Sequence, residues 1–374
     1  MFAYSLHVPG RCYKPRKLIP SLLCKLDSYR EACGDDDTST VHISAHGRKA
    51  NAAFWEAPLL LYLRVRMAII NFGSINIDHV YLVPHFVSPG ETLSSTDYHS
   101  VLGGKGANQS IACALAGASV KHVGSVHAND SGYTHSIRAA GVDCTHIREQ
   151  SAVPTGHAII QVNEEGENAI VLYAGANHAL DFTQIDAAIN EASAGDWVLL
   201  QNETNAIGSV INTAFDKGLN IAFNPAPMTQ EVSRLPLEKL SLLIVNEVEA
   251  MQLAQCDTVA AAEAELSKRY PNLKILLTLG KQGVRFMCAD VKVQEPAFEV
   301  EALDTTAAGD TFIGYFLHSY ISENTADSTI NEQDLRAALR TACAAAAICV
   351  TRPGAAPSIP HAEEVNEFFQ SHTE

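Results

Sequence analysis

From residue 67 onward, short apolar runs alternate with stretches of helical periodicity, and this alternation limits the possible folds more than any other feature. Strands that alternate with helices pair in parallel, because each helix provides the crossover that a parallel pair requires. The sequence therefore predicts a doubly wound α/β fold, a mostly parallel sheet with helices on both faces. The predicted strands are 67–73, 120–124, 196–201, 219–224, 241–246 and 274–279, and the predicted helices are 107–117, 181–193, 205–217, 258–269, 308–321 and 331–349.

Two regions, residues 79–102 and 155–175, interrupt this alternation because they lack long helical patterns. The second contains two strand-like runs, GHAIIQV and NAIVLYA, joined by the turn sequence NEEGE. An antiparallel flap that projects from a parallel sheet is suited to cover a ligand. We therefore expect these regions to form a small β-sheet lid.

The first 66 residues differ from the rest of the chain in charge and pattern. They carry a balance of +4, whereas the remaining residues carry −20. They show no clean periodicity, and acidic residues and the lack of a defined apolar core argue against a targeting peptide. We expect residues 1–66 to be an extension outside the fold, either poorly ordered or preceding a true start at Met67, and residues 67–374 to form the domain.

Composition excludes several classes of partner. The net charge of −16 argues against a nucleic-acid groove and against an anionic membrane surface. No apolar run is long enough to span a bilayer. The nine cysteines form no CxxC pair, so a reducing, cytoplasmic location is expected in place of a disulfide framework. A local group of backbone N–H donors can still bind an anion on such an acidic protein.

The stretch DTTAAGDTF places Ala307, Ala308 and Gly309 directly before Asp310 and an apolar helical run. Small residues let backbone N–H groups approach an anion closely, and a helix N-terminus carries partial positive charge. Asp310 would then lie where an acceptor hydroxyl meets a transferring phosphoryl group, as a base requires. An aspartate that only caps the helix accounts for the same residues. The stretch alone leaves both interpretations open.

A second stretch, GGKGANQ, begins at Gly103. It lacks the Walker spacing and is therefore not a P-loop. Glycines at 103, 104 and 106 would free the backbone for close approach to a small polar ligand, while Lys105 and Asn108 would supply polar contacts. A glycine-rich turn from strand to helix explains the stretch equally well.

Two further stretches place polar side chains at predicted strand ends, where open parallel sheets bind ligands. In GSINIDHV, Asn76 and Asp78 share a face and suit a polyol, although a simple turn is also possible. In VNEVEA, Asn246 and Glu249 lie on one side of a helix start and suit water or Mg²⁺ beside phosphates. A capping box is the alternative for that pair. The stretch TLGKQG, residues 278–283, would border a nucleotide.

The order and spacing of these stretches resemble the ribokinase family of sugar kinases. The matching stretches are GSINIDHV, GGKGANQ, EGENAIVLYAGAN, NPAP, VNEVE, TLGKQG, DTTAAGDTF and AAAAICVTRPGAAPSIP. The resemblance covers roughly residues 67–370. It implies a doubly wound α/β domain with a small β lid that uses ATP to phosphorylate the 5-hydroxyl of ribose.

The resemblance also implies roles for individual residues. Asp310 would be the general base, and the N–H groups of Ala307, Ala308 and Gly309 would form an anion hole for the γ-phosphate. The implied sugar positions are Asn76, Ile77, Asp78, Gly104, Lys105, Gly106, Ala107, Asn108, Glu203 and Asp310. The implied nucleotide positions are Asn246, Thr278, Leu279, Gly280, Lys281, Gln282, Gly283, Gly309, Asp310 and Cys343.

Metal ions and a partner follow from the same resemblance. An activating K⁺ would be held at Asp304, Thr306, Cys349, Arg352, Gly354 and Ser358, many of them through backbone carbonyls. Glu249 would act on Mg²⁺ indirectly. Cys343 departs from the family pattern, since close relatives often have another residue, such as His, facing the adenine. The lid strands would pair two copies into a homodimer.

Two alternatives stay open at the level of sequence. The chain could be a kinase for a related sugar, such as deoxyribose or fructose, because pocket walls decide that choice. It could also be a catalytically silent sugar-binding protein on the same scaffold, since a fold does not fix a function.

Overall fold

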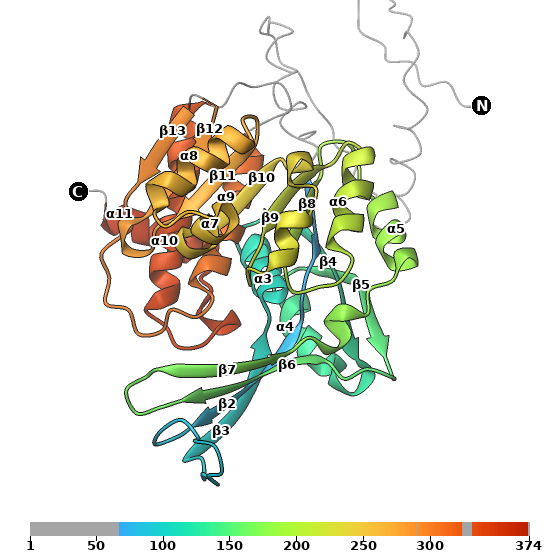
Figure 1. Ribbon diagram of the computed structural model, residues 1–374, viewed down its shortest axis with the longest axis vertical. Coiled ribbons are helices and arrows are strands. Elements are labelled where there is room, and N and C mark those ends of the chain that lie inside the picture. The colour runs from blue at the N-terminus through green and yellow to red at the C-terminus, as the bar shows by residue number, and fades with distance from the viewer. Residues whose placement is uncertain (1–66, 290, 324–330, 373–374) are drawn as a thin grey trace, which may run out of the picture. The chain divides into compact units, whose positions relative to one another are not determined.

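The computed structural model describes residues 67–289, 291–323 and 331–372, so the predicted extension at 1–66 lies outside the described residues. Its main sheet has the strand order β13-β12-β11-β10-β9-β8-β1-β4-β5 (Figure 1). Neighbouring strands are parallel from β5 to β11, and β12 and β13 are antiparallel additions at one edge. The strands are β1 Ala68–Phe72, β4 Ser119–His127, β5 Asp143–Gln150, β8 Trp197–Gln201, β9 Asn220–Asn224, β10 Leu242–Asn246, β11 Lys274–Thr278, β12 Val284–Cys288 and β13 Val291–Glu295.

All six predicted strands are confirmed, as β1, β4, β8, β9, β10 and β11. The prediction missed three strands at the sheet edges, β5, β12 and β13. β5 reads DCTHIREQ and β13 reads VKVQE, and these polar sequences lack the apolar run of a strand buried on both faces. Edge strands have one exposed side, so their composition carries a weaker pattern.

The six predicted helices are also confirmed, and three further ones, α4, α7 and α11, join them. Within the described ranges, no helix is both long and apolar enough to cross a membrane. The helices are α3 Lys105–Leu115, α4 Thr134–Ala139, α5 Phe182–Asn190, α6 Ile207–Asp216, α7 Glu247–Ala254, α8 Val259–Arg269, α9 Ala308–Glu323, α10 Glu332–Val350 and α11 Ala362–Ser371. Short 3₁₀ turns are η1 Ala128–Tyr133, η2 Gly175–His178, η3 Gln230–Arg234, η4 Leu237–Lys239, η5 Gly280–Gln282 and η6 Ala356–Ser358.

The sheet separates two apolar cores, as a doubly wound fold requires. Successive strand residues point to opposite faces, so Ile69 and Leu199 pack in one core while Ile70 and Leu200 pack in the other. Helices α3, α4, α9, α10 and α11 contribute to the first core, and α5, α6, α7 and α8 contribute to the second (Figure 1). This arrangement confirms the predicted fold class.

A second sheet of four strands forms the predicted lid, in the order β3-β2-β6-β7. In Figure 1 these strands lie apart from the helix-covered sheet and extend beyond it. The β2–β6 pair is parallel, whereas β2–β3 and β6–β7 are antiparallel. The lid is thus a mixed sheet instead of a purely antiparallel flap. Its strands are β2 Asn76–Leu82, β3 Asp97–Gly103, β6 Gly156–Val162 and β7 Asn168–Tyr173.

Candidate active site

A cavity of about 1010 Å³ lies between the carboxyl ends of the parallel strands and the inner face of the lid. Many of the predicted site residues line it. These are Asn76, Asp78, Gly104, Lys105, Asn108, Glu203, Asn246, Glu249, Thr278, Asp304, Thr306, Ala307, Gly309, Asp310 and Gly354. Asn76 and Asp78 reach it from β2 of the lid itself, and not from a turn after β1.

Asp310 lies in the first turn of α9 and is only 7% exposed. Its Oδ2 accepts a hydrogen bond from Nδ2 of Asn108 at 3.1 Å, and its Oδ1 accepts one from Nε2 of Gln109 at 2.9 Å. Both donors are neutral amides on α3, so they hold the carboxylate in place without neutralising its charge. Such a carboxylate can accept a proton at the edge of the cavity.

The loop before Asp310 has the features of an anion site, with one change from the prediction. Ala307 adopts the left-handed conformation (φ 59°), and its carbonyl accepts the first helical bond, from the Thr311 N–H at 2.8 Å. The N–H groups in the first turn of a helix have no preceding carbonyl as partner. The Ala308 N–H, however, donates to the Thr305 carbonyl at 3.3 Å. A Cβ on Gly309 would meet no atom within 4 Å, so this residue faces open space.

The carboxylates of Asp310, Glu203 and Asp78 line the cavity together with the ammonium group of Lys105. Glu203 Oε2 accepts hydrogen bonds from the Ser74 hydroxyl at 2.5 Å and from the Lys105 N–H at 3.1 Å. The charge of Asp310 raises the pKa of the Lys105 side chain against the opposing effect of burial. Burial raises the pKa of Glu203, and burial followed by the charge of Glu203 raises the pKa of Asp78 to about 6. Acceptors for hydroxyl groups are therefore concentrated in one place.

Glycines make this concentration possible. A Cβ on Gly103 would lie 1.9 Å from Oδ2 of Asp78, and Gly104 has a φ of +94° that favours glycine. At these two positions the close neighbours are protein atoms, the carboxylate of Asp78 at Gly103 and the backbone of Ser74 and Asn76 at Gly104. Gly106 approaches the backbone of Gly73 instead, where its Cβ would lie 2.3 Å from a Cα atom.

Some implied sugar positions do not reach the cavity. Ile77 lies on β2 between the two cavity-facing residues and is buried on the other side, and Ala107 packs in an apolar core. With Gly106, these residues support the local backbone and present no side chain to a ligand. The alternation along β2 accounts for Ile77, since neighbouring strand residues face opposite ways.

Sequence reasoning missed residues that orient the predicted ones. Asn177 Nδ2 donates to Oδ1 of Asn76 at 2.7 Å, and Asn177 Oδ1 accepts from the Ile75 N–H at 2.9 Å. Gln109 holds Asp310 as described above. Each missed residue lies inside a stretch already quoted, Gln109 at the end of GGKGANQ and Asn177 at the end of EGENAIVLYAGAN. Only their contacts, which join segments far apart in the chain, distinguish them.

The predicted nucleotide positions are divided. Asn246 and Glu249 form a capping box, with bonds of 2.8 and 3.0 Å, and both also line the cavity. Burial raises the pKa of Glu249. Thr278 lines the cavity, whereas the rest of its loop, residues 279–283, lies beyond it. Cys343 is buried on α10, where burial raises the pKa of its thiol to about 12, and it does not line this cavity.

The residues implied for K⁺ gather in one loop region. The Asp304 carboxylate accepts hydrogen bonds from the N–H and hydroxyl of Thr306 and from the Gly354 N–H, at 2.6–2.9 Å. Partial burial opposes ionisation of Asp304, but these bonds outweigh it and lower its pKa. Cys349 Sγ lies 3.0 Å from the Ser358 hydroxyl. The Arg352 guanidinium is directed elsewhere, to Glu364 at 2.5 Å.

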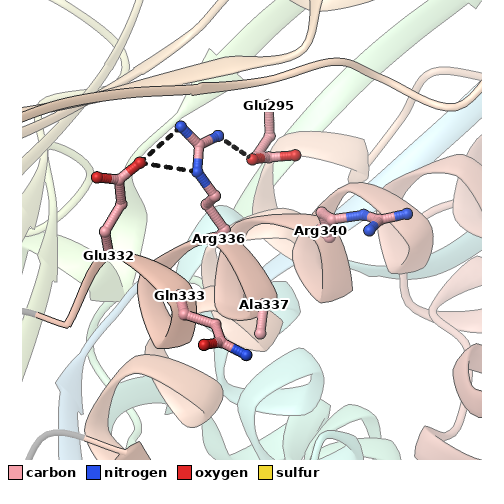
Figure 2. Close-up of a pocket in the computed structure, with 6 residues that line it drawn as sticks. All are labelled: Glu295, Glu332, Gln333, Arg336, Ala337 and Arg340. Atoms are coloured by element: carbon pink, nitrogen blue, oxygen red, sulfur yellow. Dashed lines mark hydrogen bonds and ion pairs between the residues drawn. The ribbon is translucent and has the colours of Figure 1, made fainter.

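A second hollow, of about 580 Å³, lies beside the N-terminal half of α10. Figure 2 shows Arg336 between Glu332 and Glu295, and its guanidinium bonds both carboxylates at 2.5–3.0 Å. None of the predicted site residues lines this hollow. The larger cavity, which many of the predicted site residues line, is therefore the candidate active site.

The comparisons with known proteins agree with this geometry. The family model of the pfkB family carbohydrate kinases matches residues 68–362. The ribokinase of Haemophilus influenzae is 36% identical over 314 residues, 82% of this chain and 99% of that protein. A deoxyribokinase of Salmonella typhi is 31% identical over 313 residues, 81% of this chain and 99% of that protein. The structure of Arabidopsis thaliana ribokinase complexed with ribose and ATP has a TM-score of 0.71 at 25% identity and covers 82% of this chain and 99% of its own. The chain therefore belongs to the pfkB family of carbohydrate kinases.

Proposed function

We propose that this protein transfers the γ-phosphoryl group of ATP to O5 of D-ribose and releases D-ribose 5-phosphate and ADP. The observation that carries the proposal is the position of Asp310. A buried carboxylate, held by two amides, lies in the first turn of a helix whose N–H groups open toward a cavity lined by polar strand-end residues. Similarity to named ribokinases, one of them in complex with ribose and ATP, supports this assignment.

Ribose would bind at the lid side of the cavity. Asp78 and Glu203 provide carboxylate acceptors for hydroxyl groups, and Asn76 adds an amide. Among the described residues, Oδ1 of Asn108 is buried without a hydrogen-bond partner. A buried acceptor of this kind is costly unless a ligand satisfies it, and a sugar hydroxyl is a suitable donor. Lys105, at the start of α3, would contact the sugar from the body of the domain.

Asp310 would act as the general base. It takes the proton from O5–H while the bond from O5 to the γ-phosphorus forms and the bond to the β,γ-bridging oxygen breaks. Catalysis of this reaction depends mainly on positioning and on stabilising charge. The N–H groups around Ala307 and Gly309 would bind the transferring phosphoryl group, assisted by the partial positive charge at the start of α9.

ATP would approach from the side of Thr278 and Asn246. Mg²⁺ would bind with ATP and supply positive charge near its phosphates. Glu249 fits an indirect role, because one of its carboxylate oxygens already accepts from the Asn246 N–H in the capping box. Its carboxylate also senses the charges of Lys105 and Asp310, and its second oxygen would organise water.

The Asp304 loop fits an activating monovalent cation such as K⁺. The donor set is oxygen-rich, with the Asp304 carboxylate, the Ser358 hydroxyl and backbone carbonyls close to the Ala307 turn. A cation there would add positive charge near the anion site. Arg352 and Cys349 would contribute only backbone carbonyls, since their side chains are engaged with Glu364 and Ser358.

We also propose that the protein is a homodimer formed through the lid. The face of the lid that points away from the cavity, here called the outer lid face, exposes Tyr98, Ile159, Val171 and Tyr173. Exposed apolar patches of this kind mark sites of association.

The domain is proposed to begin near residue 67. A reducing, cytoplasmic location is proposed because the cysteines of the described residues are free thiols.

Two other functions compete with this one. A kinase for a related sugar, such as deoxyribose or fructose, is favoured by the similarity to the deoxyribokinase of Salmonella typhi. A silent sugar-binding protein would have no need for a carboxylate buried beside a helix N-terminus, and the cost of burying that charge argues against it.

A coupled ADP-release assay with ribose, deoxyribose and fructose, with and without K⁺, tests the proposal. We expect ribose to give the highest kcat/KM and Asp310→Ala to lower kcat by a factor of about 10² to 10⁴. Asp216→Ala, an exposed position on α6, is the matched control and should keep full activity. A higher kcat/KM for deoxyribose would reassign the substrate, and tight ribose binding without turnover would favour the silent protein.

A further inference from the structure

Asp310 is the end of a chain of buried polar side chains that the proposed reaction does not yet use. Gln109 is fully buried, and its Nε2 donates to Asp310 at 2.9 Å and to Oδ1 of Asn224 at 3.3 Å. Its Oε1 accepts from Nε2 of Gln201 at 2.7 Å, and the same Gln201 nitrogen donates to Oδ1 of Asn71 at 3.0 Å. Three buried amides thus lead from the catalytic carboxylate into the core.

The chain continues to a histidine on β4. Asn71 Nδ2 donates to the Ser110 hydroxyl at 2.8 Å, and that hydroxyl lies 2.8 Å from Nδ1 of His122. His122 Nε2 lies 3.1 Å from the Gly73 carbonyl oxygen. Burial lowers the pKa of His122 to about 4, against the opposing effect of the Gly73 bond, so this ring is neutral near pH 7.

The far end of the chain determines the direction of every bond in it. A carbonyl oxygen can only accept, so Nε2 of the neutral His122 must donate to Gly73, and its Nδ1 must accept from Ser110. The Ser110 oxygen is then free to accept from an amide nitrogen of Asn71, and the Asn71 oxygen accepts from Gln201.

The same logic fixes Gln109. Gln201 presents its nitrogen to both Asn71 and Gln109, so the Gln109 side-chain oxygen faces Gln201. The Gln109 nitrogen is thereby left facing Asp310. An amide flip would break the bonds of Gln109 to Asp310, Asn224 and Gln201, and it would place the Gln109 oxygen against two other acceptors.

We propose that Gln109 is a positioning residue for the general base Asp310, and that Gln201 and Asn71 lock its amide with the donor toward the carboxylate. This inference rests on the proposed function. The donor restrains Asp310 Oδ1, so that the carboxylate is held in the orientation in which it receives the proton. A merely structural core would be more cheaply filled by apolar side chains of the same volume, since buried amides are costly to satisfy.

Two substitutions separate this role from packing. Gln109→Met keeps the approximate volume but removes the donor, and Gln109→Glu keeps the shape but replaces the donor with an acidic group. We expect Gln109→Met to lower kcat about 10- to 100-fold, the size of effect caused by a misplaced reacting group. The KM values for ribose and ATP should change less than about threefold, because Gln109 does not line the cavity.

The pH profile gives a readout that a structural role would not move. The acid limb of kcat should shift to higher pH in Gln109→Met, because the base loses a hydrogen-bond donor. In Gln109→Glu the shift should be larger, since two carboxyl groups in contact do not both ionise. The matched control is Gln184→Met, another buried glutamine, whose Nε2 bonds the Gly124 and His146 carbonyls far from Asp310.

The outcomes distinguish this inference from the proposed function. Wild-type turnover together with unchanged kcat and pH profile in folded Gln109 variants would overturn the positioning role alone. Equal losses in Gln184→Met and Gln109→Met would also overturn it, because they would indicate a general effect on the core. A wild-type protein without sugar-dependent turnover would overturn both proposals. Loss of kcat with a shifted acid limb, confined to Gln109, would support the assignment.

Discussion

The two sides of the cavity differ in how fully their residues are buried and bonded. We call the residues around Asp310 the floor and the four-stranded lid the cover. On the floor, Asp310, Asn108 and Gln109 are buried, and the two amides each donate to Asp310, at 3.1 and 2.9 Å. In the cover, apolar residues of one strand are exposed on both faces of the lid sheet, with Leu172 toward the cavity and Val171 toward the outside. The side chains of the floor are already hydrogen-bonded and buried, whereas the lid still exposes apolar surface that a ligand or a partner could bury.

This difference assigns separate tasks to the two regions. Groups that stabilise a transition state work best when they are fixed before the substrate arrives, and the buried amides around Asp310 meet that condition. A cover must open and close, so it comes from the less stable part of a fold. We therefore expect substitutions in the floor to change chemistry, and substitutions in the lid to change binding and association.

Among substitutions that change binding, the largest effect is expected for Asp78→Asn, at the border between the two regions. The substitution removes a charged acceptor from the proposed sugar site, and hydrogen bonds to charged groups are worth about 1.5–3 kcal/mol. The Kd for ribose should therefore rise roughly 10- to 100-fold. Calorimetric titration with ribose measures this change, and an unaltered Kd would remove Asp78 from the sugar site.

The same variant makes a prediction about stability and pH. Asp78 has a pKa raised from 3.8 to about 6 by burial, so the folded protein binds its proton more tightly than the unfolded chain does. Stability then falls as pH rises from about 4 to 6, and the loss persists above that range. We expect Asp78→Asn to raise the free energy of unfolding by about 1–2 kcal/mol at pH 7.5 and by little at pH 4. Urea unfolding at both values checks this, and equal changes at both would contradict it.

A smaller effect on catalysis is expected for Val171→Glu on the outer lid face. This residue is 66% exposed in one copy, and a charge there would be buried in a dimer formed through the lid. We expect the variant to be monomeric, with kcat/KM lowered by less than about tenfold because the floor is untouched. Sedimentation velocity measures the assembly. Phe182→Glu, at an exposed aromatic position on α5, is the matched control and should stay dimeric.

The smallest effect is expected for deletion of residues 1–66. The family match begins at residue 68, and β1 begins at Ala68. A chain that starts at Met67 should therefore retain kcat and KM within about twofold, since floor and lid both follow that point. Steady-state kinetics of the two chains make the comparison. An insoluble or inactive shorter chain would show that the domain extends further toward the N-terminus.

The layered fold could be predicted because burial on both faces leaves a strong pattern in sequence. Runs such as LLIVN of β10 are apolar throughout, and the helices between the strands repeat with helical period. The lid and the sheet edges were harder. β5 and β13 are polar, and the parallel pairing of β2 with β6 joins segments about 80 residues apart, which no local pattern records.

Some residues of the site could likewise be predicted from sequence, and others could not. Asp310 could be proposed because phosphoryl transfer requires a base and small residues at a helix start. Lys105 and Asn108 could be proposed because they are polar residues in a glycine-rich loop. Gln109 and Asn177 could not, since their function depends on what they touch across more than 100 residues of chain. Ile77 was assigned by its place within a stretch, and the alternation of β2 turns it away from the cavity.

The lid supplies residues of the proposed sugar site as well as covering it. Asn76 and Asp78 belong to β2, and β3 runs through Gly103 directly into the helix that begins with Lys105. A carbohydrate bound to Asp78 would therefore move together with the lid when the lid bends. The same movement would bring the alcohol to the base and expel water. The phosphoryl group of ATP would then be transferred to the sugar hydroxyl and not to water.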